Sequence, residues 1–468
     1  MKKRWSFLSK TVAFAGLVVF LVACGGSDEP PAAGGGDAGG GTGGGGGGGA
    51  PAPGETVTLN FHAWNDQVQQ RFEATVTLPE GVYVNWVITP NEANAYQIHI
   101  NNLLLNNPGE IDLFAAEVDH IRNYTFPDIT MDVVGDIGLT AADLANMYEF
   151  TLQAASDANG IVRGVSWEAN PGLFLYRRSI ALEVFGTDDP VYIQSRVGTW
   201  DGFIEVAHIM AEHGYQMLSG FDDSYRVFAN NMANPWVDEN NVIVIDPLIH
   251  EWIDQTVYFT DNNFNNRSSL WDSVWTSDQG SGSTVFGFFY STWGIAFTLL
   301  ANSLDTPVAE GGLLEVGNGL FGDWAAVHGP ASWNWGGTWI MAPSSSTADR
   351  ELLRSIMYQM TVSEDGLMTI ADQFGDFVNS SRLMGEVAAD PDFGNPFLGG
   401  QNHIALFVDT APYITMDNIS QFDQALTSAV QTAMTDYFNG IVTREQAWDN
   451  FFIHATTLHP HLKRPEGF

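Results

Sequence analysis

Strand-like and helix-like segments alternate directly after residue 55, and this order restricts the fold more than any other feature of the sequence. Thr56–Phe61, Gly81–Ile88 and Ile111–Ala115 have the alternating or continuous apolar pattern of β-strands. A helix that Asn65 can cap follows the first segment, and the spacing of apolar residues predicts a second helix over Ala93–Asn106. Strand–helix–strand–helix–strand order requires parallel strands with right-handed crossovers, so we expect an α/β fold.

Helix starts are also readable further along the chain. Thr140 with Asp143 and Thr443 with Gln446 have the spacing of capping boxes, and Thr199 is placed as a third N-cap. We find no internal repeat and no heptad array, which excludes solenoids and coiled coils.

The N-terminus has the features of an export signal. Lys2–Arg4 precede an apolar run, Val12–Val22, that is too short to span a bilayer permanently. Leu21-Val22-Ala23-Cys24 resembles a bacterial lipobox. We therefore predict that residues 1–23 are a lipoprotein signal peptide and that Cys24 becomes the lipidated first residue of the mature chain.

Residues 24–54 are predicted to be a flexible tether. They consist almost entirely of Gly, Ala, Pro, Ser and Asp, with a continuous glycine run at Gly43–Gly49, and cannot form a core. The remaining residues, 55–468, are sufficient for a two-lobed body. Cys24 is the only cysteine in the sequence, so the mature protein forms no internal disulfide.

The charge of the chain excludes several partners. The formal net charge is -37 at pH 7, so nucleic acid and anionic membrane surfaces would repel the protein, and we expect membrane contact through the N-terminal lipid alone. After residue 54 Lys463 is the only lysine, whereas arginines remain. Arginine keeps its charge in alkali and lysine loses it, so an alkaline habitat explains this choice; a salty habitat is the alternative.

Several segments in a fixed order resemble one family. They are Gly164–Trp167, Leu173–Arg178, Thr199–Phe203, Phe286–Trp293, Asp323–Ile340 and Gly440–Ala447. Together they resemble the extracytoplasmic solute-binding proteins of sugar ABC transporters, over essentially everything after residue 55. The resemblance implies a two-lobed, periplasmic-binding-protein-like fold of type II, with the ligand cleft between the lobes. By analogy lobe 1 is approximately 55–160 and 322–361, and lobe 2 approximately 161–321 and 362–468.

Five positions in three segments depart from the family pattern. Arg177 and Arg178 stand where the family usually has Asn and Lys, and Gly202 stands where an acid is usual. Ser291 and Thr292 replace the usual Gly-Pro before the ligand-facing Trp293, which affects the expected pose of that ring.

Sugar recognition requires flat aromatic faces and planar polar groups that take hydroxyls. The sequence has 15 Trp, and position together with the resemblance selects the ligand-binding candidates, which are Trp64, Asn65, Asp66, Glu117, Asp119, Trp167, Glu168, Asn170, Tyr290, Trp293, Trp335 and Gly337. Trp324 and Trp339 lie inside strand-like runs and are expected in the core. Trp271 and Trp275, four residues apart, are interpreted as the buried stripe of a helix.

The sequence therefore predicts a lipid-anchored receptor that binds a sugar or oligosaccharide and delivers it to the permease subunits of an ABC importer. We expect a monomer with no catalytic residues, no cofactor and no metal. A receptor for a polyamine or another cation on the same fold is an alternative, because Trp and carboxylates also cage cations. A surface glycosidase is a less favoured one, since no particular pair of acids is marked.

Overall fold

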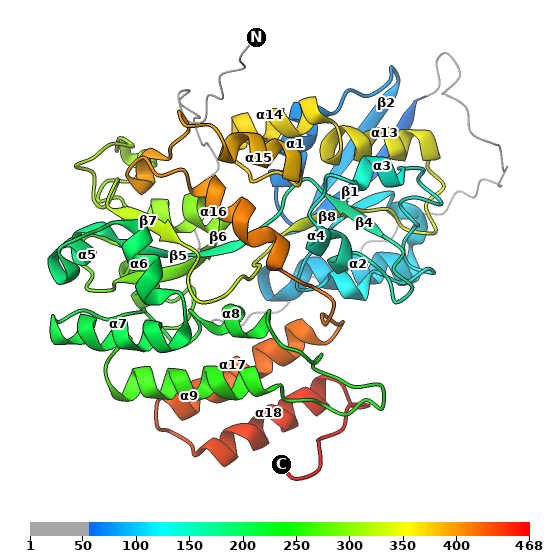
Figure 1. The fold of residues 1–468 in the computed structure, drawn as a ribbon. Helices are drawn as coiled ribbons and strands as arrows, with labels where there is room; N and C mark the ends of the chain where they lie inside the picture. The colour runs from blue at the N-terminus through cyan, green and yellow to red at the C-terminus, as the bar shows by residue number, and fades with distance from the viewer. Residues whose placement is uncertain (1–55) are drawn as a thin grey trace, which may run out of the picture.

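The computed structural model describes residues 56–468, so the predicted signal peptide, Cys24 and the tether lie outside the described residues. Two β-sheets organise this body. The large sheet has five strands in the order β2-β1-β3-β8-β4, and the small sheet has three in the order β6-β5-β7. Figure 1 shows them side by side. The strands are β1 (Val57–Ala63), β2 (Val82–Ile88), β3 (Leu113–Glu117), β4 (Gly164–Ser166), β5 (Gly172–Arg177), β6 (Gly287–Ser291), β7 (Trp324–Val327) and β8 (Thr338–Met341).

The parallel opening of the fold is confirmed. Strand β1 pairs in parallel with β2 on one side and with β3 on the other. The connections run through α1 (Gln67–Thr75) and α2 (Ala95–Asn106). Because the two right-handed crossovers move in opposite directions along the sheet, they place α1 and α2 on opposite faces, as Figure 1 shows.

The rest of the large sheet is antiparallel. Strand β8 pairs in the antiparallel sense with β3 and with β4. These strands come from distant parts of the sequence and are not linked by helical crossovers to their neighbours, so local alternation predicted only the first part of the sheet.

Helices cover both sheets and form a separate layer below the small sheet in Figure 1. Besides α1 and α2, they are α3 (Ala141–Leu144), α4 (Glu149–Ala154), α5 (Arg178–Phe185), α6 (Pro190–Val197), α7 (Trp200–Glu212), α8 (Tyr225–Ala229), α9 (Pro247–Asp261), α10 (Ser273–Ser277), α11 (Thr292–Gly294), α12 (Ala301–Ser303), α13 (Arg350–Thr361), α14 (Glu364–Phe374), α15 (Ser381–Ala388), α16 (His403–Thr410), α17 (Asp423–Phe438) and α18 (Arg444–Leu458). The lower layer has its own core, which includes Trp252 of α9, Leu426 of α17 and Phe451 of α18.

The predicted N-caps are confirmed with one correction. Thr140 and Thr443 form capping boxes at α3 and α18, and Thr199 accepts a hydrogen bond from the Gly202 N–H at the start of α7. The correction concerns α1, whose N-cap is Asp66 and not Asn65. The Asn65 Oδ1 still accepts a hydrogen bond from the backbone of the first helical residue.

Three segments carry the chain between the sheets, and together we call them the crossing ribbon: residues 167–171, 328–337 and 375–380. The first lies in the middle. Its Ala169 N–H donates to the Phe377 carbonyl oxygen at 3.0 Å, and its Asn170 carbonyl oxygen accepts from the Trp335 N–H at 3.1 Å. The ribbon therefore holds both sheets at one junction.

The crossing ribbon does not coincide with the lobe boundaries expected from the sequence. Strand β7 lies within the predicted range of lobe 1, but it pairs with β5 in the small sheet. Helix α14 was assigned to lobe 2, but it packs against α1 of the large sheet. We therefore propose crossings at the ribbon itself in place of the approximate boundaries near 160, 321 and 361.

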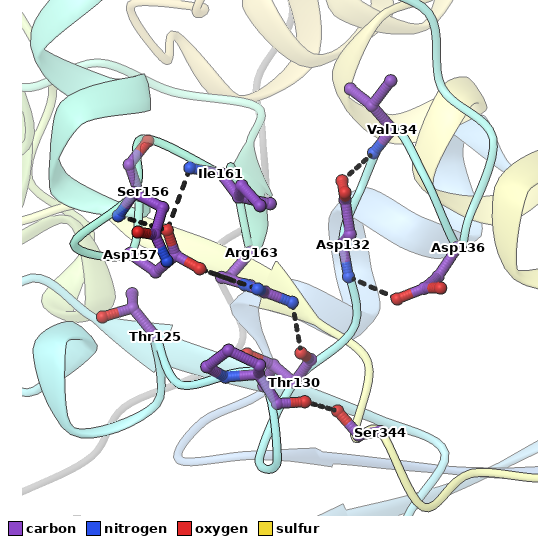
Figure 2. Close-up of polar contacts among 12 residues, drawn as sticks. Thr125, Thr130, Asp132, Val134, Asp136, Ser156, Asp157, Ile161, Arg163 and Ser344 are labelled. Carbon is purple, nitrogen blue, oxygen red and sulfur yellow. Dashed lines mark hydrogen bonds and ion pairs between the residues drawn. The ribbon is translucent and has the colours of Figure 1, made fainter.

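A buried ion pair fixes the turn that leads into β4. Arg163 donates to Asp157 Oδ2 from Nε at 3.1 Å and from Nη2 at 2.7 Å, and its Nη1 donates to the Thr130 carbonyl oxygen (Figure 2). The two side chains are 6% and 4% exposed. This network ties the turn to the neighbouring loop and thereby sets where β4 enters the large sheet.

No helix within residues 56–468 has both the length and the apolar character needed to cross a bilayer.

Candidate functional site

The candidate site lies where one edge of the large sheet meets the crossing ribbon. Strands β1, β3 and β4 all end at this edge, and β8 begins there, with Glu117 paired to Thr338 and Ser166 paired to Trp339. Residues that follow β1, β3 and β4 in the sequence therefore converge, as expected for the carboxyl ends of strands in an open α/β sheet.

An acidic pair and one arginine occupy the end of β3. Arg226 of α8 donates to both oxygens of Asp119, from Nη1 at 3.0 Å and from Nη2 at 2.6 Å. The Glu117 Oε2 accepts a hydrogen bond from the Asp119 N–H at 2.8 Å. Arg226 also lies over the ring of Trp335, with its Cζ 5.3 Å from the ring centroid. Arg226 thus connects the end of the large sheet to an aromatic residue of the crossing ribbon.

The two acids of this pair titrate in opposite directions. Burial, reinforced by the nearby Asp119 charge, raises the pKa of Glu117 to about 8. Burial acts in the same sense on Asp119, but the Arg226 charge and its hydrogen bonds outweigh it and lower the pKa of Asp119. At neutral pH Glu117 can therefore keep a proton and donate a hydrogen bond, while Asp119 is ionised.

A second arginine–carboxylate pair lies at the end of β4. Arg71 of α1 donates to both oxygens of Asp376, at 3.0 Å and 2.8 Å. Trp167 donates its indole N–H to the same carboxylate at 3.0 Å and is 2% exposed. Burial and the neighbouring Asp376 charge raise the pKa of Glu168 to about 7. In this arrangement Trp167 packs beneath the site, and Glu168, the next residue in the chain, is the polar group beside it.

The aromatic candidates gather on the other side of the junction. The Trp293 and Trp335 rings lie 5.0 Å apart and nearly perpendicular, and Trp293 Nε1 donates to the Trp335 carbonyl oxygen at 2.8 Å. Tyr290 lies beneath them, fully buried, and donates to Gln279. Asn170 Oδ1 accepts a hydrogen bond from Thr292 Oγ1, at the position that departs from the family's Gly-Pro. That hydroxyl therefore fixes the start of the Trp293 turn to the crossing ribbon.

The remaining candidates lie around this centre. Trp64 is half-buried and packs edge-on against Tyr96. Asp66 is exposed, and its Oδ2 accepts a hydrogen bond from Gln70. Gly337 has a φ of 131°, and a Cβ there would lie 2.7 Å from the Trp339 ring, so glycine is required at this turn.

A cavity of about 200 Å³ adjoins the Asp119–Arg226 pair. It lies between the end of the large sheet and the helical layer, and its polar lining includes Asp119, Arg226, Asn334, Asp423 and Thr427. Asn334 Oδ1 is buried and has no hydrogen-bond partner within the described residues. Burial raises the pKa of Asp423 to about 7. The cavity therefore presents hydrogen-bonding groups of both kinds to a small polar ligand.

Sequence analysis did not identify four residues of the site, the arginines Arg71 and Arg226 and the acids Asp376 and Asp423. Their partners are far away in the chain: Arg71 and Asp376 are 305 positions apart, and Asp119 and Arg226 are 107 positions apart. One signal was available: in a chain with 18 Lys and Arg against 55 Asp and Glu, each arginine is scarce.

The interpretation of Trp271 and Trp275 as one buried stripe is wrong for Trp271. Trp275 is 1% exposed, but Trp271 is 55% exposed and precedes α10, so helical spacing does not apply to it. Trp324 and Trp339 are buried in their strands, as expected. No cluster of three or more potential metal-ligating side chains occurs among residues 56–468.

Comparisons with known proteins give matches at the level of structure. No protein-family model and no curated protein matches the sequence. A crystal structure of an extracellular solute-binding protein of family 1 superposes with a TM-score of 0.70 at 17% identity, over 86% of this chain and 99% of that one. The galacto-N-biose/lacto-N-biose I-binding protein of the ABC transporter from Bifidobacterium longum, in complex with lacto-N-biose, gives 0.63 at 14% identity, over 87% and 97%.

A third match is the ABC transporter associated binding protein from B. animalis subsp. lactis in complex with β-1,6-galactobiose, with a TM-score of 0.60 at 15% identity, over 88% of this chain and 100% of that one. Near-complete coverage in both directions shows that the chain has the two-lobed α/β fold of extracellular solute-binding proteins. This confirms the predicted fold class.

Proposed function

We propose that this protein is the membrane-tethered substrate-binding receptor of a carbohydrate ABC importer, which captures a sugar or oligosaccharide and delivers it to the permease. One observation carries the proposal: at the junction of the two sheets, the rings of Trp293 and Trp335 lie beside Arg226, Asp119 and Glu117. Indole faces stack on the C–H patches of a pyranose, and carboxyl and guanidinium groups bind its hydroxyls. The site offers both kinds of surface together.

The structural matches support the same ligand class. Two of the superposed proteins were solved with lacto-N-biose and β-1,6-galactobiose. These proteins are binding proteins, and we propose that this chain likewise binds its ligand without catalysis and works as a monomer. Binding energy would stabilise a closed arrangement of the lobes that the permease recognises.

A direct binding measurement tests the proposal. The full chain carrying Cys24→Ser, which cannot be lipidated, is titrated with a panel of mono- and oligosaccharides and followed by Trp fluorescence and calorimetry. We expect saturable binding of at least one sugar and no release of reducing ends. Failure of every sugar to bind would exclude a carbohydrate receptor, and sustained release of reducing ends would establish a glycosidase.

The Trp293 ring gives a more specific expectation. Trp293→Ala removes the half-buried indole that packs on Trp335, and we expect sugar affinity to fall by about 1 to 3 kcal/mol, as for loss of an aromatic anchor. Calorimetry with the best ligand of the panel measures the change. Tyr83→Ala is the control, because Tyr83 is 59% exposed on the edge strand β2. Equal affinity in all three proteins would remove Trp293 from the site.

A cation receptor is the second candidate, because the site holds Glu117, Glu168 and Asp423 without a guanidinium bonded directly to any of them. A polyamine would lower their raised pKa values and bind as the acids ionise. Binding of spermidine that weakens steeply with ionic strength would favour this candidate, since the binding of a neutral sugar is nearly independent of salt.

The lipid anchor stays a prediction from the sequence. We propose that Cys24 is acylated and that residues 24–54 hold the body near the outer face of the cell membrane. The expected result is membrane fractionation and palmitate labelling of the wild type in a bacterial host, with both lost in Cys24→Ser.

A further inference from the structure

Trp271 is an exposed aromatic residue in a backbone conformation that disfavours it. Its side chain is 55% exposed, and its φ is 72°, in the left-handed region that bulky residues rarely adopt. Such a conformation persists only where the surrounding structure imposes it, and strained residues of this kind gather at functional sites. Trp271 therefore needs an explanation other than folding.

The ring of Trp271 continues the aromatic surface of the candidate site. Its centroid lies 6.2 Å from that of Trp293, with the planes 15° apart, and 6.1 Å from that of Trp335. The first arrangement is offset-parallel, so the two indoles form a step and not a closed stack. Phe297, 61% exposed, also neighbours Trp293, with the ring centroids 6.1 Å apart. The aromatic surface thus extends outward from the buried Trp335 to exposed Trp271.

The backbone on both sides of Trp271 is fixed. The Ser269 N–H donates to Asp272 Oδ2 at 2.9 Å, and Asp272 Oδ1 accepts from the Trp275 N–H at 2.7 Å as the N-cap of α10. The Leu270 N–H donates to Asp222 Oδ2 at 3.4 Å, three residues before the first residue of α8, the helix of Arg226. The backbone that carries the indole is consequently ordered before any ligand arrives, which lowers the entropic cost of stacking on the ring.

The cavity beside Arg226 is small for a complete ligand. Its volume of about 200 Å³ lies below the about 300 to 1,000 Å³ of pockets that enclose a drug-sized ligand. Arg226 lines that cavity and its guanidinium also lies over the Trp335 ring, so this one side chain borders both the cavity and the aromatic step. A ligand that fills the cavity and extends along the step would pass Trp335 and Trp293 and reach Trp271.

We infer that Trp271 is an outer stacking subsite and that the ligand is an oligosaccharide with at least one sugar unit outside the cavity. This inference rests on the proposed carbohydrate receptor. Sugar units nearest the cavity contact Trp335 and Trp293, and the outer unit stacks on Trp271. Trp271 therefore distinguishes longer from shorter oligosaccharides, because the shorter ones do not reach its ring.

The test uses Trp271→Gly, because glycine adopts a φ of 72° without strain and keeps the turn. Wild type, Trp271→Gly, Trp293→Ala and the control Tyr83→Ala are titrated with linkage-matched series from monosaccharide to hexasaccharide. We expect Trp271→Gly to weaken binding of the longer oligosaccharides about tenfold and to leave the shortest ligands within about twofold of wild type. Trp293→Ala should weaken binding at every length.

Two further readouts separate a ligand subsite from a structural role. Trp271→Gly should melt no lower than the wild type, because it removes backbone strain and an exposed ring. Longer oligosaccharides should protect wild-type fluorescence from iodide quenching, and Trp271→Gly should lose this protection. Unchanged affinity at every length, or an equal loss at every length with a lower melting temperature, would overturn the inference and leave the receptor proposal intact. A wild type that binds no sugar would overturn both.

Discussion

At the scale of single residues, Glu117 couples the candidate site to pH. Its pKa is raised to about 8 by burial and by the Asp119 charge. In the unfolded chain the same carboxyl loses its proton near its ordinary value of 4.5. Between these two values the folded state holds more protons than the unfolded state, so the free energy of unfolding falls as pH rises from about 4.5 to about 8.

Glu117→Gln should reduce this pH dependence. The amide cannot ionise, and its oxygen can still accept the Asp119 N–H, so we expect a shallower loss of stability between about pH 5 and pH 8 and a more stable variant above pH 8, by an amount on the order of a few kcal/mol. Urea unfolding at a series of pH values measures this. Glu239→Gln is the control, since Glu239 is exposed. Parallel curves for wild type and Glu117→Gln would contradict the expectation.

Asp119 acts in the opposite sense and in a different pH range. Because Arg226 lowers the pKa of Asp119 despite burial, this carboxylate contributes stability that is present above its unfolded pKa and is lost as the pH falls through the folded value. The Glu117→Gln comparison above pH 5 is therefore little affected by it.

A site residue could be predicted from the sequence only where the pattern that indicates it is local in the chain. Glu117 and Glu168 come directly after strand-like segments, so the rule on strand ends located them. Arg226 and Asp376 are recognised only through partners brought close by the fold. Trp271 was misinterpreted because a spacing of four residues implies a helix face only when both residues belong to the helix.

At the scale of elements, the turn before β8 sets the position of Trp293. Gly336 has a φ of 89°, and a Cβ there would lie 2.6 Å from Trp293 Nε1, the atom that donates to the Trp335 carbonyl oxygen. The glycine thus allows an element of the crossing ribbon to approach the indole closely.

Gly336→Ala should therefore shift the indole and strain the turn. We expect a loss of stability of about 1 to 3 kcal/mol and weaker sugar binding, measured by thermal melting and calorimetry. Gly385→Ala serves as control, because Gly385 lies in helix α15 with open space where a Cβ would lie; this variant should be more stable by about 0.5 to 1 kcal/mol, with unchanged binding. If Gly336→Ala matches this control, the turn does not position Trp293.

Elements defined by local pattern were predicted well. The parallel β1, β2 and β3 and the caps at Thr140 and Thr443 depend on residues a few positions apart. The antiparallel pairing of β8 with β3 was not predicted, because those strands are separated by nearly half of the chain and no local pattern specifies the pairing.

At the scale of the whole molecule, the ion pairs of the described residues all use arginine. Lys463, the single lysine of the body, donates to the Asn240 carbonyl oxygen. A guanidinium stays charged well above pH 10, whereas an amine titrates near 10.4. None of these ion pairs is therefore expected to weaken through loss of the cation in moderately alkaline solution.

If an alkaline habitat selected this composition, stability should be nearly constant from about pH 8.5 to about pH 9.5, after the decline that the buried acids cause at lower pH. Nearer pH 10 stability should fall in either case, because burial raises the pKa of tyrosines such as Tyr124, Tyr148 and Tyr225 while the same phenols ionise in the unfolded chain. If a salty habitat selected it, added salt at neutral pH should raise the melting temperature by screening repulsion among the excess carboxylates. Melting series over pH and over salt distinguish the two. A steep fall between about pH 8.5 and about pH 9.5 contradicts the first expectation, and insensitivity to salt contradicts the second.

The crossing ribbon also determines how many independent motions the lobes can have. Three segments lie side by side and are joined by backbone hydrogen bonds at Ala169, Asn170 and Asn379. Rotation of the lobes about an axis across the ribbon bends all three segments alike. Twisting or sliding of the lobes would instead stretch one segment relative to another. The lobes should accordingly have a single rotational degree of freedom, so that one distance between a pair of fluorescent labels, one on each lobe, describes the complete path from open to closed.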